Sequence, residues 1–133
     1  MTTDCTECGA PAVSVPIPGD LREHAPGDAP AMAVCTSCLS VQPLGAHPEN
    51  SGDLSRISPE FPDDPDVAAA LALLLATIDS IAIYHDEVVA SVERLERAGV
   101  DPLSALDRLA RDPDLDPATD LRRRGLQLEQ LLE

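Results

Sequence analysis

The chain contains no lysine. All nine of its basic residues are arginine, whereas it has 15 aspartates and nine glutamates, so its formal net charge is −15 over 133 residues. Carboxylates bind hydrated cations, and molar salt screens their mutual repulsion, while omitting lysine removes long apolar stems that associate when salt strengthens hydrophobic contacts. An ordinary acidic protein with an anionic interaction face would not explain the complete lack of lysine. We therefore interpret the acidity as an adaptation to the cytoplasm of a halophile, which says little about partners.

The sequence also lacks a convincing membrane span and the motifs of common enzymes. The apolar run over residues 67–83 is 17 residues long, rich in alanine, interrupted by Asp79 and flanked by acids rather than by basic residues, which disfavours a membrane helix. There is no nucleophile elbow, phosphate-binding loop, dinucleotide fingerprint or histidine-rich metal signature. We expect a protein that is neither a membrane protein nor an enzyme.

Cysteine occurs only in two Cys-x-x-Cys pairs, which 26 residues separate. The four residues are Cys5, Cys8, Cys35 and Cys38. Each pair is a short loop whose two thiolates can bind one ion together, and two such loops side by side complete the tetrahedral set of sulfurs that Zn²⁺ accepts. Four sulfurs with none left over predict one structural Zn²⁺, with no coordination position open for catalysis.

Iron, redox chemistry and disulfides are the alternatives for these cysteines. Neither pair has the strand-then-helix context of a thioredoxin-type dithiol. No signal-peptide pattern precedes Cys5, so we expect an intracellular protein, in which disulfides are rare. Ligand type and spacing favour zinc over iron.

The residues around the cysteines predict a zinc ribbon over residues 1–44. Val13, Val15 and Ile17 alternate with serine and proline, as in an edge strand, and 31–34 and 39–41 predict two more short strands. Gly9 follows the first pair where a tight turn needs positive φ, but Leu39 stands at the matching position of the second pair. The few apolar side chains of the ribbon cannot offset its ordering cost, so we expect folding to depend on the metal.

Composition changes after the ribbon. Residues 45–64 are rich in Pro, Ser and Asp and show no hydrophobic period, which predicts a linker with Phe61 as its anchor on a packed surface. His47 lies in this stretch, and we interpret it as a solvated loop residue.

A helical domain is predicted over residues 65–133. Asp64 and Pro65 signal a helix start and Gly99 a stop, and between them apolar residues recur with a period of 3.5, which predicts one long helix. Asp101-Pro102 and Asp116-Pro117 predict two shorter helices over 102–111 and 117–132. The fold class is therefore α+β: a ribbon of short antiparallel strands, then a helical hairpin or bundle.

The beginning of the long helix, residues 67–78, is apolar on nearly every side. One short partner helix cannot cover that much surface, so we expect self-association through the segment 67–95, with Leu71, Leu74 and Ile78 buried by a second subunit. A protein partner at this surface is the alternative.

Several single residues invite functional interpretations that we consider weaker than structural ones. His85 falls on the apolar seam without a second ligand at helical spacing, which favours a hydrogen-bonded core or register-setting histidine. Tyr84 is interpreted as a packing residue. Arg122, Arg123 and Arg124 form the only basic run, and we interpret it as a solvated helix face.

Nucleic-acid binding is disfavoured by the charge of the ribbon. Arg22 is the only basic side chain in residues 1–44, against five acids, and a Zn²⁺ held by four thiolates adds a formal −2. The ribbon also has no aromatic side chain for base stacking. Specific base readout does not strictly require a basic domain, so the possibility stays open.

The two Cys-x-x-Cys pairs, the lysine-free acidic surface and the alanine- and leucine-rich helix after Pro65 resemble the small zinc-ribbon proteins of haloarchaea, in particular a family of unknown function with a helical C-terminal half. This resemblance implies zinc at Cys5, Cys8, Cys35 and Cys38 and a haloarchaeal cytoplasm. It implies no activity.

These observations predict a non-catalytic zinc-ribbon protein that acts as a protein-interaction or scaffold module. The first alternative is an accessory factor in transcription or another nucleic-acid process, in which the ribbon is the contact module. A weaker alternative is a zinc-dependent thiol redox sensor.

Overall fold

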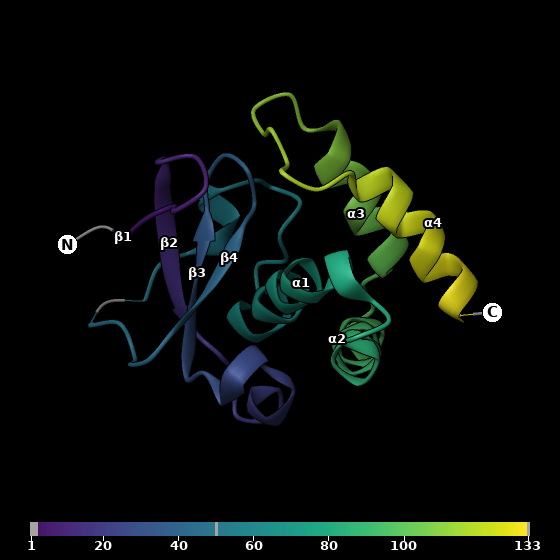
Figure 1. The fold of residues 1–133 in the computed structure, drawn as a ribbon, viewed down its shortest axis with the longest axis horizontal. Helices are drawn as coiled ribbons and strands as arrows, with labels where there is room; N and C mark the ends of the chain where they lie inside the picture. The colour runs from purple at the N-terminus through teal and green to yellow at the C-terminus, as the bar shows by residue number, and fades with distance from the viewer. Residues whose placement is uncertain (1–2, 50, 133) are drawn as a thin grey trace.

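The computed structural model describes residues 3–49 and 51–132. Within these residues an antiparallel sheet is followed by four α-helices, so the predicted α+β class is confirmed (Figure 1). The strands are β1 (Thr3–Asp4), β2 (Pro11–Pro16), β3 (Ala31–Cys35) and β4 (Val41–Leu44), in the spatial order β1-β2-β3-β4. The helices are α1 (Pro65–Thr77), α2 (His85–Arg97), α3 (Pro102–Arg111) and α4 (Leu121–Leu132).

The sheet places its central strand in the core and the two cysteine loops at one end. Every residue of β3 is buried, and Val15 of β2 pairs with Met32 of β3 on the inner side. The predicted strand over 39–41 is displaced, because Leu39 adopts a left-handed conformation (φ 62°) in the cysteine loop and β4 begins at Val41. Both connections that carry cysteines therefore join neighbouring antiparallel strands.

The single long helix predicted between Pro65 and Gly99 is wrong. The chain leaves α1 through a 3₁₀ turn over Ile78–Ser80, and the N–H groups of Ile83 and Tyr84 both donate to the Ser80 carbonyl before α2 begins. At the end of α1 the Thr77 hydroxyl donates back to the Leu73 carbonyl at 2.9 Å, a contact that often bends helices. The break lets α2 fold back and pack against α1.

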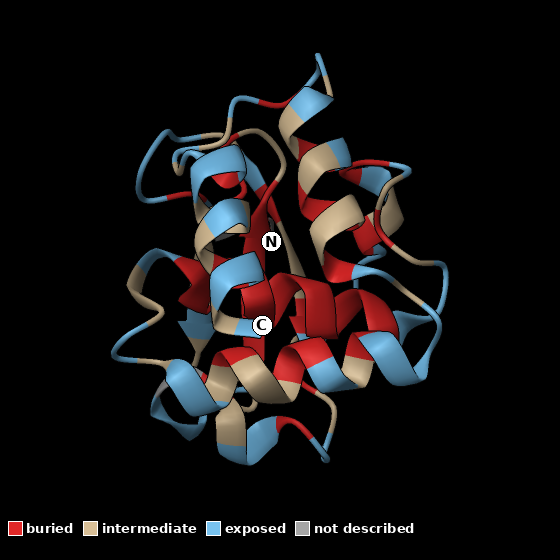
Figure 2. Cartoon of the chain, turned by 90° about the vertical axis from the view of Figure 1, so that its right-hand side faces the viewer, coloured by how far each residue is buried: buried red, intermediate tan, exposed pale blue. Residues whose placement is uncertain are grey.

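The helix α1 is apolar on every side because the rest of the chain surrounds it. It lies between the sheet and the other helices (Figure 1), and it is coloured as buried along almost its whole length (Figure 2). Leu71, Leu74 and Ile78 have no exposed surface in a single chain. These three side chains are therefore covered from within the chain and are not available to a second subunit, whereas self-association itself stays a prediction.

Residues 45–64 also contribute to the core. Phe61 is buried, as predicted for the anchor of this segment, and Leu54 and Ile57 are buried with it. A short 3₁₀ helix over Leu54–Arg56 begins at Asp53, whose carboxylate accepts from the Ser55 N–H. One hydrophobic cluster thus contains residues from the sheet, from this segment and from the helices.

None of the helices in the part of the chain that the structure describes is both long enough and apolar enough to cross a membrane.

Candidate metal centre

The fold brings all four cysteines together. Their Sγ atoms lie within 4.8 Å of one another, with Cys5 at 3.6 Å from Cys38 and Cys8 at 3.4 Å from Cys35. A metal–sulfur bond of about 2.3 Å in a tetrahedron gives sulfur–sulfur edges of about 3.8 Å, whereas a disulfide would be about 2.05 Å. None of the four forms a disulfide. The arrangement fits a tetrahedral metal ion, and four soft thiolates are the donor set that zinc and iron accept.

Two similar loops hold these side chains. Cys5 follows β1, and its N–H donates to the Ala10 carbonyl at 2.8 Å; Cys35 ends β3, and its N–H donates to the Ser40 carbonyl at 2.9 Å. In each loop the residue after the second cysteine has positive φ, 79° at Gly9 and 62° at Leu39.

Leu39 therefore performs the turn that glycine performs in the first loop. The left-handed conformation costs a side-chain-bearing residue on the order of 1–2 kcal/mol. Leu39 is buried in the main hydrophobic core, and burying a leucine side chain contributes about 1.5–3 kcal/mol, which offsets this strain.

Backbone N–H groups point at the sulfurs, as a thiolate cluster requires. Glu7 N lies 3.4 Å from Cys5 Sγ, and Ser37 N lies 3.3 Å from Cys35 Sγ. The N–H groups of Cys8 and then Glu7 hold the pKa of the Cys5 thiol at about 7, below its ordinary 9.0, although its burial opposes them. Burial raises the pKa of Cys38, and Ser40 Oγ at 3.1 Å from its sulfur acts in the opposite direction.

The second cysteine loop is also hydrogen-bonded to the helical half of the chain. The N–H of Asp116 donates to the Ser37 carbonyl at 2.8 Å, and the N–H of Ala118 donates to the Cys38 carbonyl at 2.9 Å. Both donors lie in the connection between α3 and α4. Of the four cysteines, Cys5, Cys35 and Cys38 are buried, and Cys8 is exposed.

The comparison with protein families can now be set beside this geometry. The model of a family of unknown function (DUF6276) matches residues 4–132. The chain belongs to this family. No curated protein and no solved structure matches the chain. The predicted resemblance to a family of unknown function is therefore confirmed, while the haloarchaeal origin stays an expectation.

In this DUF6276 member, no histidine among the described residues joins the cysteine cluster. His47 is exposed in a loop, as predicted, and Tyr84 is half-buried against the core, as expected of a packing residue. The core role predicted for His85 is wrong: it is the first residue of α2, its side chain is 55% exposed, and its Nδ1 lies 3.4 Å from Asp86 Oδ1. The helix break explains the difference, because it removes His85 from the continuous seam.

The basic run of α4 is a solvated face only in part. Arg122 and Arg123 are exposed, as predicted. Arg124 is half-buried, with its Nε 3.5 Å from Asp79 Oδ1, and Thr119 Oγ1 donates to the other oxygen of the same carboxylate at 2.7 Å. Asp79 thereby ties the turn after α1 to the start of α4.

Proposed function

We propose that the chain is a non-catalytic zinc-ribbon protein that acts as a protein-interaction or scaffold module in the cytoplasm of a halophile. The observation that carries this proposal is the convergence of four cysteine sulfurs in a closed set, on a second loop whose Ser37 and Cys38 carbonyls accept hydrogen bonds from the connection between α3 and α4. An ion bound here would have a structural role and not a catalytic one, since four protein sulfurs leave a tetrahedral ion no position for water or substrate.

Zinc is the ion proposed on the chemistry of the donors. It accepts four thiolates in a tetrahedron without a redox change, and structural zinc contributes on the order of 10 kcal/mol or more to the folding of small modules. Bound here, it would fix the ends of β1 and β3 against each other. Through Asp116 and Ala118 it would also hold the α3–α4 connection in place.

The charge of the surface favours a protein partner over a nucleic acid. The exposed loop of the first cysteine pair carries Glu7, the strand before it carries Asp4, and a zinc–tetrathiolate adds further negative charge. This face repels phosphate unless salt screens it. An accessory role in a nucleic-acid process is therefore the second candidate, and a thiol sensor using the exposed Cys8 is the third.

The metal is tested by elemental analysis of protein purified without added metal. We expect close to one zinc per chain. Cys8→Ser should lose the metal, and protease should then cleave the ribbon; Glu7→Gln, in the same loop but without a ligand change, should keep both metal and resistance. Iron in place of zinc, or a disulfide between the two pairs, would overturn the structural-zinc proposal.

The interaction role is tested by affinity purification at molar KCl, with nuclease treatment. We expect a protein to be recovered in stoichiometric amount with the wild type and with Glu7→Gln, and to be lost with Cys8→Ser. Recovery that disappears on nuclease treatment would support the nucleic-acid role instead.

A further inference from the structure

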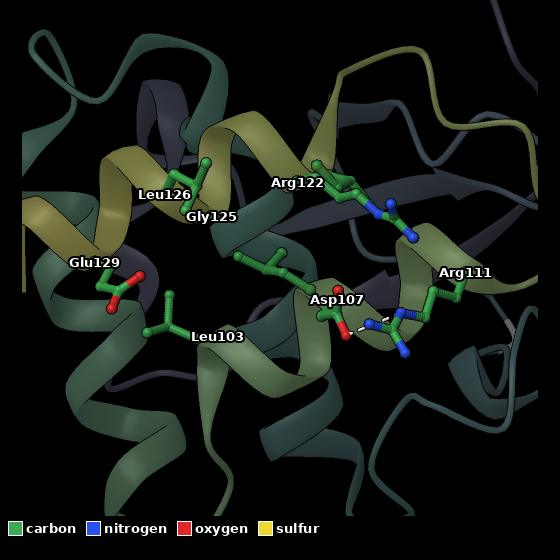
Figure 3. Close-up of a pocket in the computed structure, with 9 residues that line it drawn as sticks. Leu103, Asp107, Arg111, Arg122, Gly125, Leu126 and Glu129 are labelled. Carbon is green, nitrogen blue, oxygen red and sulfur yellow. Dashed lines mark ion pairs between the residues drawn. The ribbon is translucent and has the colours of Figure 1, made fainter.

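The helices α3 and α4 form a groove on the side of the molecule opposite the sheet. They run antiparallel, with Leu103 and Glu129 at one end and Arg111 and Arg122 at the other (Figure 3). The groove encloses about 330 Å³. Its middle is apolar, and Leu126, whose side chain is 63% exposed, lines it together with Leu103 and Leu106.

The two ends of the groove carry opposite charge. Arg122 is exposed at one end, beside Arg111, whose Nε pairs with Asp107 at 3.2 Å. Glu129 is exposed at the other end. Arg122 and Glu129 are seven residues apart on α4, which places them on one side of the helix about 10 Å from each other, too far to pair within the chain.

The midpoint between these two charges falls between Gly125 and Leu126. Glycine inside a helix is less stable than alanine, so an interior glycine calls for a packing reason. Within residues 3–49 and 51–132, a Cβ at Gly125 would meet no atom of the neighbouring structure within 4 Å. The chain itself therefore gives no reason for glycine here, whereas close approach by another helix would.

We propose that this groove binds a second copy of the chain. The two α4 helices pack antiparallel about a two-fold axis that passes beside Gly125, and Arg122 of each copy pairs with Glu129 of the other. Leu126 of each copy packs on the apolar middle of the opposite groove. The inference rests on the proposed interaction role and gives it one definite partner.

The positions of Arg122 and Glu129 are compatible with a two-fold axis between the copies. In such an interface the same patch serves both copies, so it must be complementary to itself after rotation. An arginine and a glutamate placed evenly on either side of a small residue meet that condition. The long-range repulsion between two chains of net charge −15 is screened at molar salt, where the Debye length is about 3 Å.

The test is sedimentation of the full, zinc-loaded chain in about 1 M KCl, with point changes on α4. The wild type should be a dimer at micromolar concentration. Leu126→Glu should be a monomer, whereas Ile83→Glu, an equally drastic change at a residue that is 77% exposed before α2, should remain a dimer. Both residues are exposed, so neither change should disturb the fold, which circular dichroism checks.

Charge reversal identifies the pairing. Arg122→Glu and Glu129→Arg should each weaken the dimer about threefold or more, and the double variant should recover most of the wild-type affinity, since only an intermolecular pair is restored by exchanging both charges. A monomeric wild type would overturn the inference, and so would a dimer that Leu126→Glu leaves intact or a double variant no better than the single ones. Affinity purification then separates the two claims: if a different protein is still recovered with a monomeric wild type, the proposed function stands without this interface.

Discussion

Gly52 fastens the proline-rich segment to the edge of the sheet. Its N–H donates to the Ser14 carbonyl at 2.8 Å, on the part of β2 that the two-residue strand β1 does not reach. A Cβ at position 52 would overlap Val13 Cγ1. The φ of Gly52 does not lie in the left-handed region, so backbone conformation does not require glycine here. The close approach of Val13 does.

We expect Gly52→Ala to destabilise the chain by about 1–3 kcal/mol, the usual cost of overpacking. Denaturant unfolding at fixed salt and zinc measures it. Gly45→Ala is the matched control, because a Cβ at Gly45 meets nothing within 4 Å, and it should be neutral or slightly stabilising. Adding Val13→Ala to Gly52→Ala should recover part of the loss; equal behaviour of the two glycine variants would contradict the close contact.

The pKa values of the cysteine thiols determine how metal binding should depend on pH. Its pKa of about 7 in the folded chain lies below the ordinary 9.0, so the metal-free fold favours the thiolate. The lowered pKa of Cys5 therefore stabilises the folded, metal-free chain. This stabilisation is complete above pH 9.0, and it is lost as the pH falls through about 7. The raised pKa of Cys38 keeps that thiol protonated to higher pH.

Zinc must displace the protons that remain on the sulfurs, so its apparent affinity should fall steadily between about pH 8 and pH 5. Competition with a chromophoric chelator of known pH dependence measures this. An affinity that is constant across the range would show that the four sulfurs are not the ligands.

At the scale of the elements, local signals predicted where helices begin better than where they bend. Asp64 caps α1, with its carboxylate accepting from the Asp66 N–H at 2.9 Å, and Asp101 caps α3 in the same way. Gly99 has φ 83° just after α2, as its stop signal requires. The apolar period did not predict the break after Thr77. Because α1 and α2 pack against the same core, the period continues on both sides of the turn. The cluster Thr77-Ile78-Asp79-Ser80 was the local signal available.

The start of α4 was predicted too early for a different reason. Asp116-Pro117 has the pattern of a helix start, yet α4 begins at Leu121. The N–H groups of Asp116 and Ala118 donate to the second cysteine loop, so residues 116–120 are not helical. Spacing alone was sufficient to select the four cysteines, but no local pattern could reveal a contact between residues nearly 80 positions apart, such as Ser37 and Asp116.

At the scale of the whole molecule, a small apolar interior is enclosed by a strongly acidic surface. The core extends from the sheet to α4 as one cluster, and the exposed residues include most of the carboxylates. Six ion pairs are found among the described residues, two of them with a histidine, so many acids have no basic neighbour to neutralise them. Self-repulsion of this charge opposes the compact state at low ionic strength.

Stability should therefore rise from about 0.1 M to 2 M KCl, since the Debye length falls from about 10 Å to below 3 Å and the repulsion between neighbouring carboxylates is screened. Thermal unfolding of the zinc-loaded Leu126→Glu variant measures this without a contribution from dimerisation. Sucrose at equal osmolality separates screening from exclusion effects.

The matched variant changes four exposed aspartates to asparagine, which raises the net charge by four: Asp4, Asp28, Asp114 and Asp116. It should be more stable than its parent at 0.1 M and should gain less from added salt, because fewer like charges remain to be screened. If the melting temperature does not change with KCl, or if the fourfold variant has the same salt dependence as its parent, carboxylate repulsion does not govern the stability of this fold, and the halophilic interpretation fails with it.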